Sequence, residues 1–194
     1  MMVYERRNPN DPWLTSDMIK ILSTYLRPTD IGLEFGSGRS TLWFAKRINK
    51  LTSVEHDQKW FGIVKNQLHQ EPKLNVDYRL CEDGIQNDAA TDYVNICSTI
   101  PSESLDFVLI DGVARDHCAL ASLDKIRSGG ILIVDNVNWF FPRPVKVRSV
   151  SPNSRRPEDG YASDAWSHVG THIADWRFVW TSNGVTDTAF WVKP

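Results

Sequence analysis

Apolar residues recur along the chain with two alternating periods, one typical of helices and one typical of strands. A helical pattern at 16–26 ends at Pro28, and further helical patterns lie near 40–48, around Trp60 and at 116–126. Short apolar runs predict five strands, at 31–35, 51–54, 76–80, 105–110 and 131–134. Strands that alternate with helices at this interval indicate a parallel sheet covered by helices on both faces.

The last third of the chain follows a different pattern. Residues 140–160 are rich in proline and arginine and lack periodicity, which predicts a long loop that either closes as a lid over a site or stays solvated. A helical pattern at 166–176 follows, and two strand-like runs then flank Asn183-Gly184, a hairpin signal. We therefore expect one α/β domain over 1–194, with an N-terminal helix region at 1–28. Its doubly wound, mostly parallel seven-stranded sheet closes on an antiparallel hairpin strand.

Composition places the chain among ordinary globular proteins. It has 194 residues, of which 41% are hydrophobic and 24% charged, and its net charge is −2. We expect a cytoplasmic location and no membrane partner, because no apolar run reaches the length of a membrane span and the start lacks the apolar core of a signal peptide. Basic and acidic residues are interspersed, which argues against a nucleic-acid partner.

Candidate binding residues gather where the first two predicted strands end, the edge at which doubly wound sheets bind ligands. Gly36 and Gly38 fall in the first strand-to-helix turn, in LEFGSGRST, where missing side chains let a ligand approach backbone N–H groups. Glu55 ends the second strand, nineteen positions after Gly36. An acidic residue there can accept the ribose hydroxyls of a dinucleotide or of an adenosyl cofactor.

Two features distinguish this turn from the dinucleotide-binding G-x-G-x-x-G motif. Thr41 stands in the place of the third glycine, and Glu34 lies two positions before Gly36. A carboxylate disfavours a pyrophosphate but tolerates a sulfonium amino acid, whose ammonium and sulfonium groups are cations. With LEFGSG as first motif and SVEHD at the end of the second strand, the sequence resembles the class I S-adenosylmethionine-dependent methyltransferases from about Pro12 onward. The closing hairpin fits that family's antiparallel seventh strand.

This resemblance implies a role for each matching position. The two glycines of the turn would line the methionine end of S-adenosylmethionine, and Glu34 would lie near its amino acid portion, directly or through water. Glu55 would hold the ribose, His56 would flank the adenine, and Asp83, just past the third strand, would meet the adenine amino group. Apart from the resemblance, Asp83 is as typical of a helix cap and His56 of a solvated surface residue.

Three oxygen-bearing side chains end predicted strands four and five, namely Asp111, Asp135 and Asn136. Carboxylate and amide oxygens suit Mg²⁺, and the set resembles the trio of the catechol O-methyltransferase-like, metal-dependent members, whose ion binds a pair of substrate oxygens. Those enzymes carry a lysine three positions after the first aspartate, where this chain has Ala114 followed by Arg115. Because arginine stays protonated, it is a poor base, and Arg115 would bind an anionic acceptor group or pair with a carboxylate.

Three roles stay open for Asp111, which would be a metal ligand, a metal-free general base, or a residue that orients substrate or cofactor. Together the motifs predict an S-adenosylmethionine-dependent methyltransferase acting on an oxygen of a small-molecule acceptor, with Asp111 and Arg115 as catalytic candidates and Mg²⁺ as a candidate ion. One rival is an NAD-binding oxidoreductase, although the sequence has no Tyr-x-x-x-Lys pair. A second rival is a non-catalytic module that binds a partner through its arginine-rich loop.

Overall fold

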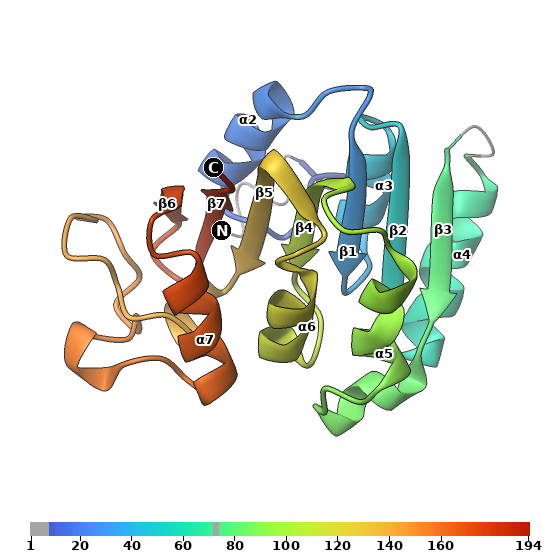
Figure 1. Cartoon of the computed structure of the whole chain (residues 1–194). Helices are drawn as coiled ribbons and strands as arrows, with labels where there is room; N and C mark the ends of the chain where they lie inside the picture. The colour runs from blue at the N-terminus through green and yellow to red at the C-terminus, as the bar shows by residue number, and fades with distance from the viewer. Residues whose placement is uncertain (1–7, 72–73) are drawn as a thin grey trace.

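The computed structural model describes residues 8–71 and 74–194. Its centre is a seven-stranded sheet of order β3-β2-β1-β4-β5-β7-β6, in which β1 to β5 are parallel and β7 is antiparallel to β5 and β6 (Figure 1). This order and its closing hairpin confirm the predicted doubly wound fold. The strands are β1 Ile31–Phe35, β2 Lys50–Glu55, β3 Val76–Leu80, β4 Leu105–Ile110, β5 Ile126–Asp135, β6 Arg177–Ser182 and β7 Asp187–Val192.

Helices cover both faces of the sheet. Apolar residues of α2 and α3 pack on one face in a single cluster, and those of α5, α6 and α7 form a second cluster on the other face. Figure 1 shows α3 and α4 behind the strands. The helices are α2 Ser16–Tyr25, α3 Arg39–Ala45, α4 Gln58–His69, α5 Asp92–Asn95, α6 Arg115–Ser122 and α7 Asp164–His172, with 3₁₀ turns η1 Glu82–Gln86, η2 Ile96–Thr99, η3 Val137–Trp139 and η4 Pro157–Asp159.

The central strand β4 explains why both faces must be covered. Phe107 and Leu109 point into the cluster under α2 and α3, whereas Val108 and Ile110 point into the cluster under α6 and α7, and all four are fully buried. Such an apolar run on both faces is typical of a parallel strand inside a sheet. The Phe107 ring fills the space over Gly32, where an added Cβ would lie 2.2 Å from the ring.

The start of β5 differs from the sequence prediction. The predicted helix at 116–126 ends at Ser122, and β5 begins at Ile126, five positions before the strand predicted at 131–134. The register with β4 shifts between Leu105 and Phe107, and Gly129 has a φ of +76°. Glycines inside a strand commonly mark such a bulge, whereas in sequence they read as a turn.

The loop predicted at 140–160 is docked onto the hairpin in this conformation. Ser151 is buried, and its backbone N–H and its hydroxyl both donate to the Asp187 carboxylate on β7. Arg155 donates to the carbonyl oxygens of Asp159, Gly160 and Tyr161. The lid role of this loop therefore stays a prediction. Among the helices of residues 8–71 and 74–194, none is both long and apolar enough to cross a membrane.

Candidate functional site

The first strand-to-helix turn is pressed against the end of β4. Gly36 has a φ of +90°, and a Cβ added to it would lie 2.6 Å from the Cα atom of Gly112. The N–H of Asp111 donates to the Phe35 carbonyl at 2.9 Å, and the N–H of Gly36 donates to the Val54 carbonyl at 2.9 Å. A glycine at position 36 is thus required by both its backbone conformation and its packing.

Gly38 has no such requirement from the chain itself. Its φ of 162° is extended backbone open to any residue, and an added Cβ would meet only the Trp60 ring, at 3.8 Å. Neither strain nor a collision within the protein explains a glycine here. A ligand that approaches the backbone at this turn would explain it.

Glu55 is held at the end of β2 by four hydrogen bonds from its own surroundings. Its Oε2 accepts from the N–H of Ser37 at 3.0 Å and from the Ser37 hydroxyl at 2.6 Å. Its Oε1 accepts from the N–H groups of His56 and Asp57 at 2.8 and 2.9 Å. The Ser37 hydroxyl is the one side-chain donor of the four, so it is the donor that a ligand hydroxyl could replace. Sequence reasoning missed Ser37.

Glu34 is a fully buried carboxyl one strand away. Its Oε2 accepts from the hydroxyls of Thr41 and Ser53, both at 2.6 Å. Thr41 therefore has a structural task in the place where a dinucleotide motif has its third glycine. Within the described part of the chain, no hydrogen bond reaches the Glu34 Oε1 atom, although the Ser40 hydroxyl lies close enough to favour the charged form of this carboxyl. Burial raises the pKa of Glu34 to about 7.

The two adenine-side candidates lie in different settings. His56 follows β2, with its Nδ1 atom 3.0 Å from Glu55 Oε1 and its ring edge-on to Tyr93. Asp83 accepts from the N–H groups of Asp92 and Tyr93 at 2.5 and 3.2 Å. Both oxygens of Asp83 thus cap α5, which is the helix-cap alternative. The capped helix begins nine positions further on, and no sequence pattern indicated it.

A cavity of about 430 Å³ opens among these residues at the carboxyl ends of β1, β2 and β4. Its charged walls are acidic, and no lysine or arginine is among the described residues that line it. The cavity therefore suits a cation better than an anion. Its lining comprises Gly36, Ser37, Glu55, His56, Asp57, Trp60, Asp111, Gly112 and Val113.

A second cavity of about 430 Å³ shares Gly112 and Val113 with the first and opens toward α7. Its aromatic wall is the stacked pair of Phe140 and Trp166, whose ring centroids are 5.2 Å apart. This volume is in the range of small-molecule sites. Its other lining residues are Ile85, Asn87, Ala114, Arg115, Asp116, Ala162 and Ser163.

Arg115 lies among the side chains that end β4 and β5. Its Nε donates to the Gly112 carbonyl at 2.8 Å. One terminal nitrogen donates to the Asp135 carbonyl at 2.8 Å and to Asn136 Oδ1 at 3.1 Å. The other donates to the carbonyl and to Oδ1 of Asp111, at 2.9 and 3.1 Å. The sequence-predicted catalytic and metal residues are thus brought together, with the guanidinium at their centre.

Burial governs the ionisation of the two aspartates. It raises the pKa of Asp111 well above its usual range, and the nearby Asp135 carboxylate raises it further, against the opposing charge of Arg115. Burial also raises the pKa of Asp135 to about 6, although a hydrogen bond from Thr188 favours its charged form. The single guanidinium of Arg115 thus lies beside the carboxyl groups of both Asp111 and Asp135.

The fit of a divalent ion to Asp111, Asp135 and Asn136 follows from where their oxygens point. Oδ1 of Asp111 and Oδ1 of Asn136 both accept from the Arg115 guanidinium, and Oδ1 of Asp135 accepts from the Thr188 hydroxyl at 2.6 Å. An ion among these oxygens would lie against a fixed positive charge. The residues present do not fit Mg²⁺, and no group of three or more His, Cys, Asp and Glu side chains elsewhere in 8–71 and 74–194 could hold a metal ion.

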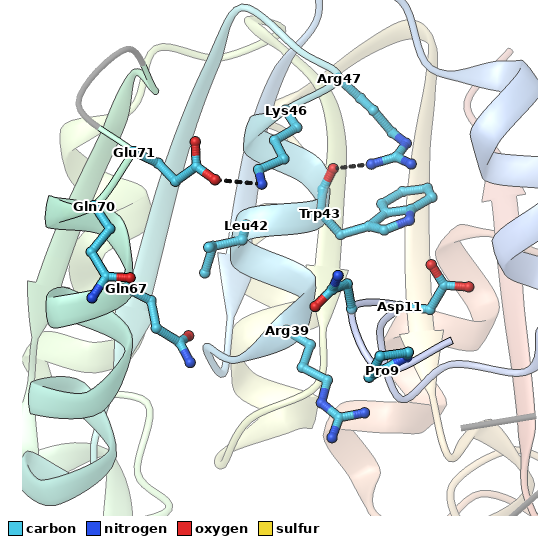
Figure 2. A pocket seen from close by; sticks show the side chains of 11 residues that line it. Pro9, Asp11, Arg39, Leu42, Trp43, Lys46, Arg47, Gln67, Gln70 and Glu71 are labelled. Carbon is cyan, nitrogen blue, oxygen red and sulfur yellow. Dashed lines mark hydrogen bonds and ion pairs between the residues drawn. The ribbon is translucent and has the colours of Figure 1, made fainter. Parts of the chain in front are cut away.

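A third cavity, of about 660 Å³, lies away from these strand ends, between α3, α4 and residues 9–11 (Figure 2). Figure 2 shows Lys46 directed toward Glu71, at 2.7 Å, and Arg47 toward the Trp43 carbonyl, at 2.8 Å. Two of the cations that line this cavity are therefore already paired within the chain, and among the residues that the structure describes, no buried polar atom without a partner belongs to its lining.

Comparison with known proteins gave matches in structure alone, since no family model and no curated protein matches the chain. A putative caffeoyl-CoA O-methyltransferase from Staphylococcus aureus matches with a TM-score of 0.62 at 15% identity, over 100% of this chain and 90% of that chain. A methyltransferase-like protein from Silicibacter pomeroyi gives 0.61 at 19%, over 95% and 89%. A methyltransferase from Geobacter sulfurreducens gives 0.60 at 12%, over 100% and 85%.

The chain has the class I methyltransferase fold. In this methyltransferase fold the two cavities lie where the strand order reverses, beyond the carboxyl ends of β1 and β4, which is where doubly wound sheets bind their ligands.

Glu34 gives the site a pH-dependent stability. The pKa of Glu34 in the fold is about 7, above the ordinary value of 4.5. Its contribution to the free energy of unfolding is therefore fully present below about pH 4.5 and is lost as the pH rises through about 7. We expect Glu34→Gln, which cannot ionise, to raise the free energy of unfolding at about pH 8 by up to roughly 3 kcal/mol and to have little effect near pH 4.5.

Urea unfolding of both proteins at the two pH values measures this difference. Glu82→Gln, at an exposed carboxyl, is the control and should change stability equally at both. A Glu34→Gln effect that is independent of pH would contradict the assignment.

Proposed function

We propose that the chain is an S-adenosylmethionine-dependent methyltransferase that acts on an oxygen of a small-molecule acceptor. The observation that carries this proposal is the acidic cavity at the ends of β1, β2 and β4, together with the unpaired Oε1 atom of buried Glu34. S-adenosylmethionine presents an ammonium and a sulfonium group, and both are cations that such walls attract.

The chain's residues supply a fitting contact for each part of this cofactor. The Glu55 carboxylate would accept the ribose hydroxyls once the Ser37 hydroxyl gives way. Glu34 would accept from the ammonium group, directly or through water, and Gly38 would leave room for the amino acid end. His56 would flank the adenine. We leave Asp83 out of this proposal, because both of its oxygens cap α5.

The second cavity would hold the acceptor, with its flat part against Phe140 and Trp166. When bound, S-adenosylmethionine supplies a methyl group carried on a positively charged sulfur. Asp111 lies in the wall of the cofactor cavity next to the residues that both cavities share, and its side chain is 23% exposed. The Asp111 carboxylate would take up the proton of the acceptor hydroxyl, while the acceptor oxygen would bond to the methyl carbon and the bond from that carbon to sulfur would break. No metal takes part in this proposal.

The two rivals are less well supported. An NAD-binding site needs groups that meet a pyrophosphate, and the described lining of the cavity offers acidic side chains and no arginine or lysine. A non-catalytic module would not need the acceptor cavity to open beside Asp111. The fold also occurs in a putative rRNA methylase from Clostridium thermocellum, so an RNA acceptor is included as an outcome of the test below.

Cofactor binding is the first test, measured by calorimetric titration with S-adenosylmethionine and with NAD⁺. We expect micromolar affinity for S-adenosylmethionine and no measurable heat with NAD⁺. Gly38→Ala should weaken S-adenosylmethionine binding about tenfold or more while the melting temperature stays within about 2 °C, because the chain itself has room for the methyl group.

The matched control is Gly62→Ala on α4, where an added Cβ meets nothing within 4 Å. Since alanine favours a helix more than glycine does, the free energy of unfolding of this variant should rise by roughly 0.5–1 kcal/mol. The variant should bind the cofactor as the wild type does. Equal affinities for Gly38→Ala and the wild type would argue against the assigned cavity.

Methyl transfer is the second test, measured with a radiolabelled methyl group against panels of phenols and alcohols and against RNA. We expect transfer to a small hydroxyl compound, and a loss of about 100-fold or more in kcat for Asp111→Asn with cofactor affinity within a few-fold of the wild type. Transfer to RNA alone would contradict the proposal of a small-molecule acceptor. An unchanged kcat in Asp111→Asn would contradict the proposed role of that carboxylate.

A further inference from the structure

The geometry points to Arg115 as the permanent cation of this centre, with its guanidinium in the place among Asp111, Asp135 and Asn136 that a divalent ion would need. A side-chain guanidinium has five N–H donors. All five are engaged, by the carbonyls of Gly112, Asp135 and Asp111 and by the side-chain oxygens of Asp111 and Asn136. No donor is left for an anionic group of the acceptor, so Arg115 acts as a positioning residue.

The backbone directs Arg115 into this place. Ala114 has a φ of +45°, in the left-handed region that residues with a side chain rarely adopt, and α6 begins immediately after it. This turn brings the Arg115 side chain back over the ends of β4 and β5. Phe140 closes the other side, with its ring centroid 5.6 Å from the guanidinium carbon. The Arg115 side chain is consequently only 16% exposed.

The neighbouring strand fixes the oxygens that would otherwise turn toward an ion. The amide nitrogen of Asn136 donates to the Thr186 hydroxyl at 2.5 Å, which directs the amide oxygen to the guanidinium. The carboxylate of Asp135 accepts from the Thr188 hydroxyl at 2.6 Å, on the side of β7. Thr186, just before β7, and Thr188, on β7, thus hold Asn136 and Asp135 in an arrangement that suits an arginine.

This arrangement narrows the acceptor class, a step that rests on the proposed function. Without an ion that binds two substrate oxygens at once, the acceptor needs a single hydroxyl. No described residue donates a hydrogen bond to Oδ2 of Asp111, so this oxygen is free to take the proton of that hydroxyl. We therefore assign a monohydroxyl compound with a flat or apolar body, rather than one that must present adjacent hydroxyls.

The test is replacement of the resident cation by an added one, measured without cofactor or acceptor. Thermal unfolding is followed with and without millimolar MnCl₂, and bound Mn²⁺ is counted by electron paramagnetic resonance. The wild type should bind no Mn²⁺ and keep its Tm. Arg115→Ala should melt about 5–15 °C lower, bind one Mn²⁺ and recover at least half of the loss, because the freed oxygens then face no positive charge.

Three controls isolate the cation role. Arg127→Ala removes another arginine that links β4 and β5, by its ion pair with Asp106 at their opposite ends, and should show no recovery with Mn²⁺. The double variant Asp111→Asn with Arg115→Ala should lose the Mn²⁺ bound by the single variant. Arg115→Lys, which keeps the charge, should fold and bind no Mn²⁺.

Two results would overturn the inference. One is Mn²⁺ bound by the wild type and lost in Asp111→Asn, and the other is a folded Arg115→Ala that neither binds Mn²⁺ nor recovers. If Arg115→Ala does not fold, the wild type and Arg115→Lys decide. Absence of methyl transfer would leave these measurements untouched, so failure of the proposed function is distinguishable. Once transfer is measured, it should be insensitive to EDTA and should not require a vicinal diol.

Discussion

The site depends on one close backbone contact, between the first strand-to-helix turn and the end of β4. A Cβ on Gly36 would lie 2.6 Å from Gly112, and a Cβ on Gly112 would lie 2.0 Å from the Tyr93 hydroxyl, so neither position accepts a side chain without movement. The hydrogen bond from Asp111 N–H to the Phe35 carbonyl holds the two segments together. Because the turn and the strand end meet here, the two cavities share one rigid part of their walls, at Gly112 and Val113.

Charge is the second constraint, because several carboxyl groups are buried close together at these strand ends. Glu34, Glu55 and Asp135 are almost completely buried near the ends of their strands, and the Asp111 side chain is 23% exposed. The guanidinium of Arg115 is the cation among the aspartates, and the pKa values of Glu34, Asp111 and Asp135 are all raised by burial. A site with this excess of acid binds a cation more readily than an anion, which links the packing of the strand ends to the choice of cofactor.

The sequence pattern predicted most of the scaffold, because strands that are buried on both sheet faces consist of continuous apolar runs. The strands predicted at 31–35, 76–80 and 105–110 have those limits in the structure. The pattern was wrong at β5, where Gly129 forms a bulge inside a strand rather than a turn before it. It left the use of Asp83 undecided, since the helix that this carboxylate caps is one turn long and too short to show a period.

The role of Arg115 shows what residue type and spacing leave out. Asp111 and Asn136 are suitable ligands for an ion by chemistry, and their positions at neighbouring strand ends suggested one. The direction of each oxygen is set by groups with no signal in the motif: the left-handed backbone of Ala114, the carbonyl oxygens of three residues, and the Thr186 hydroxyl on the hairpin. An arginine one position beyond the place of the family's lysine, after a residue that reverses the chain, reaches the oxygens that an ion would bind. The same fold can therefore supply the positive charge of its centre from its own chain.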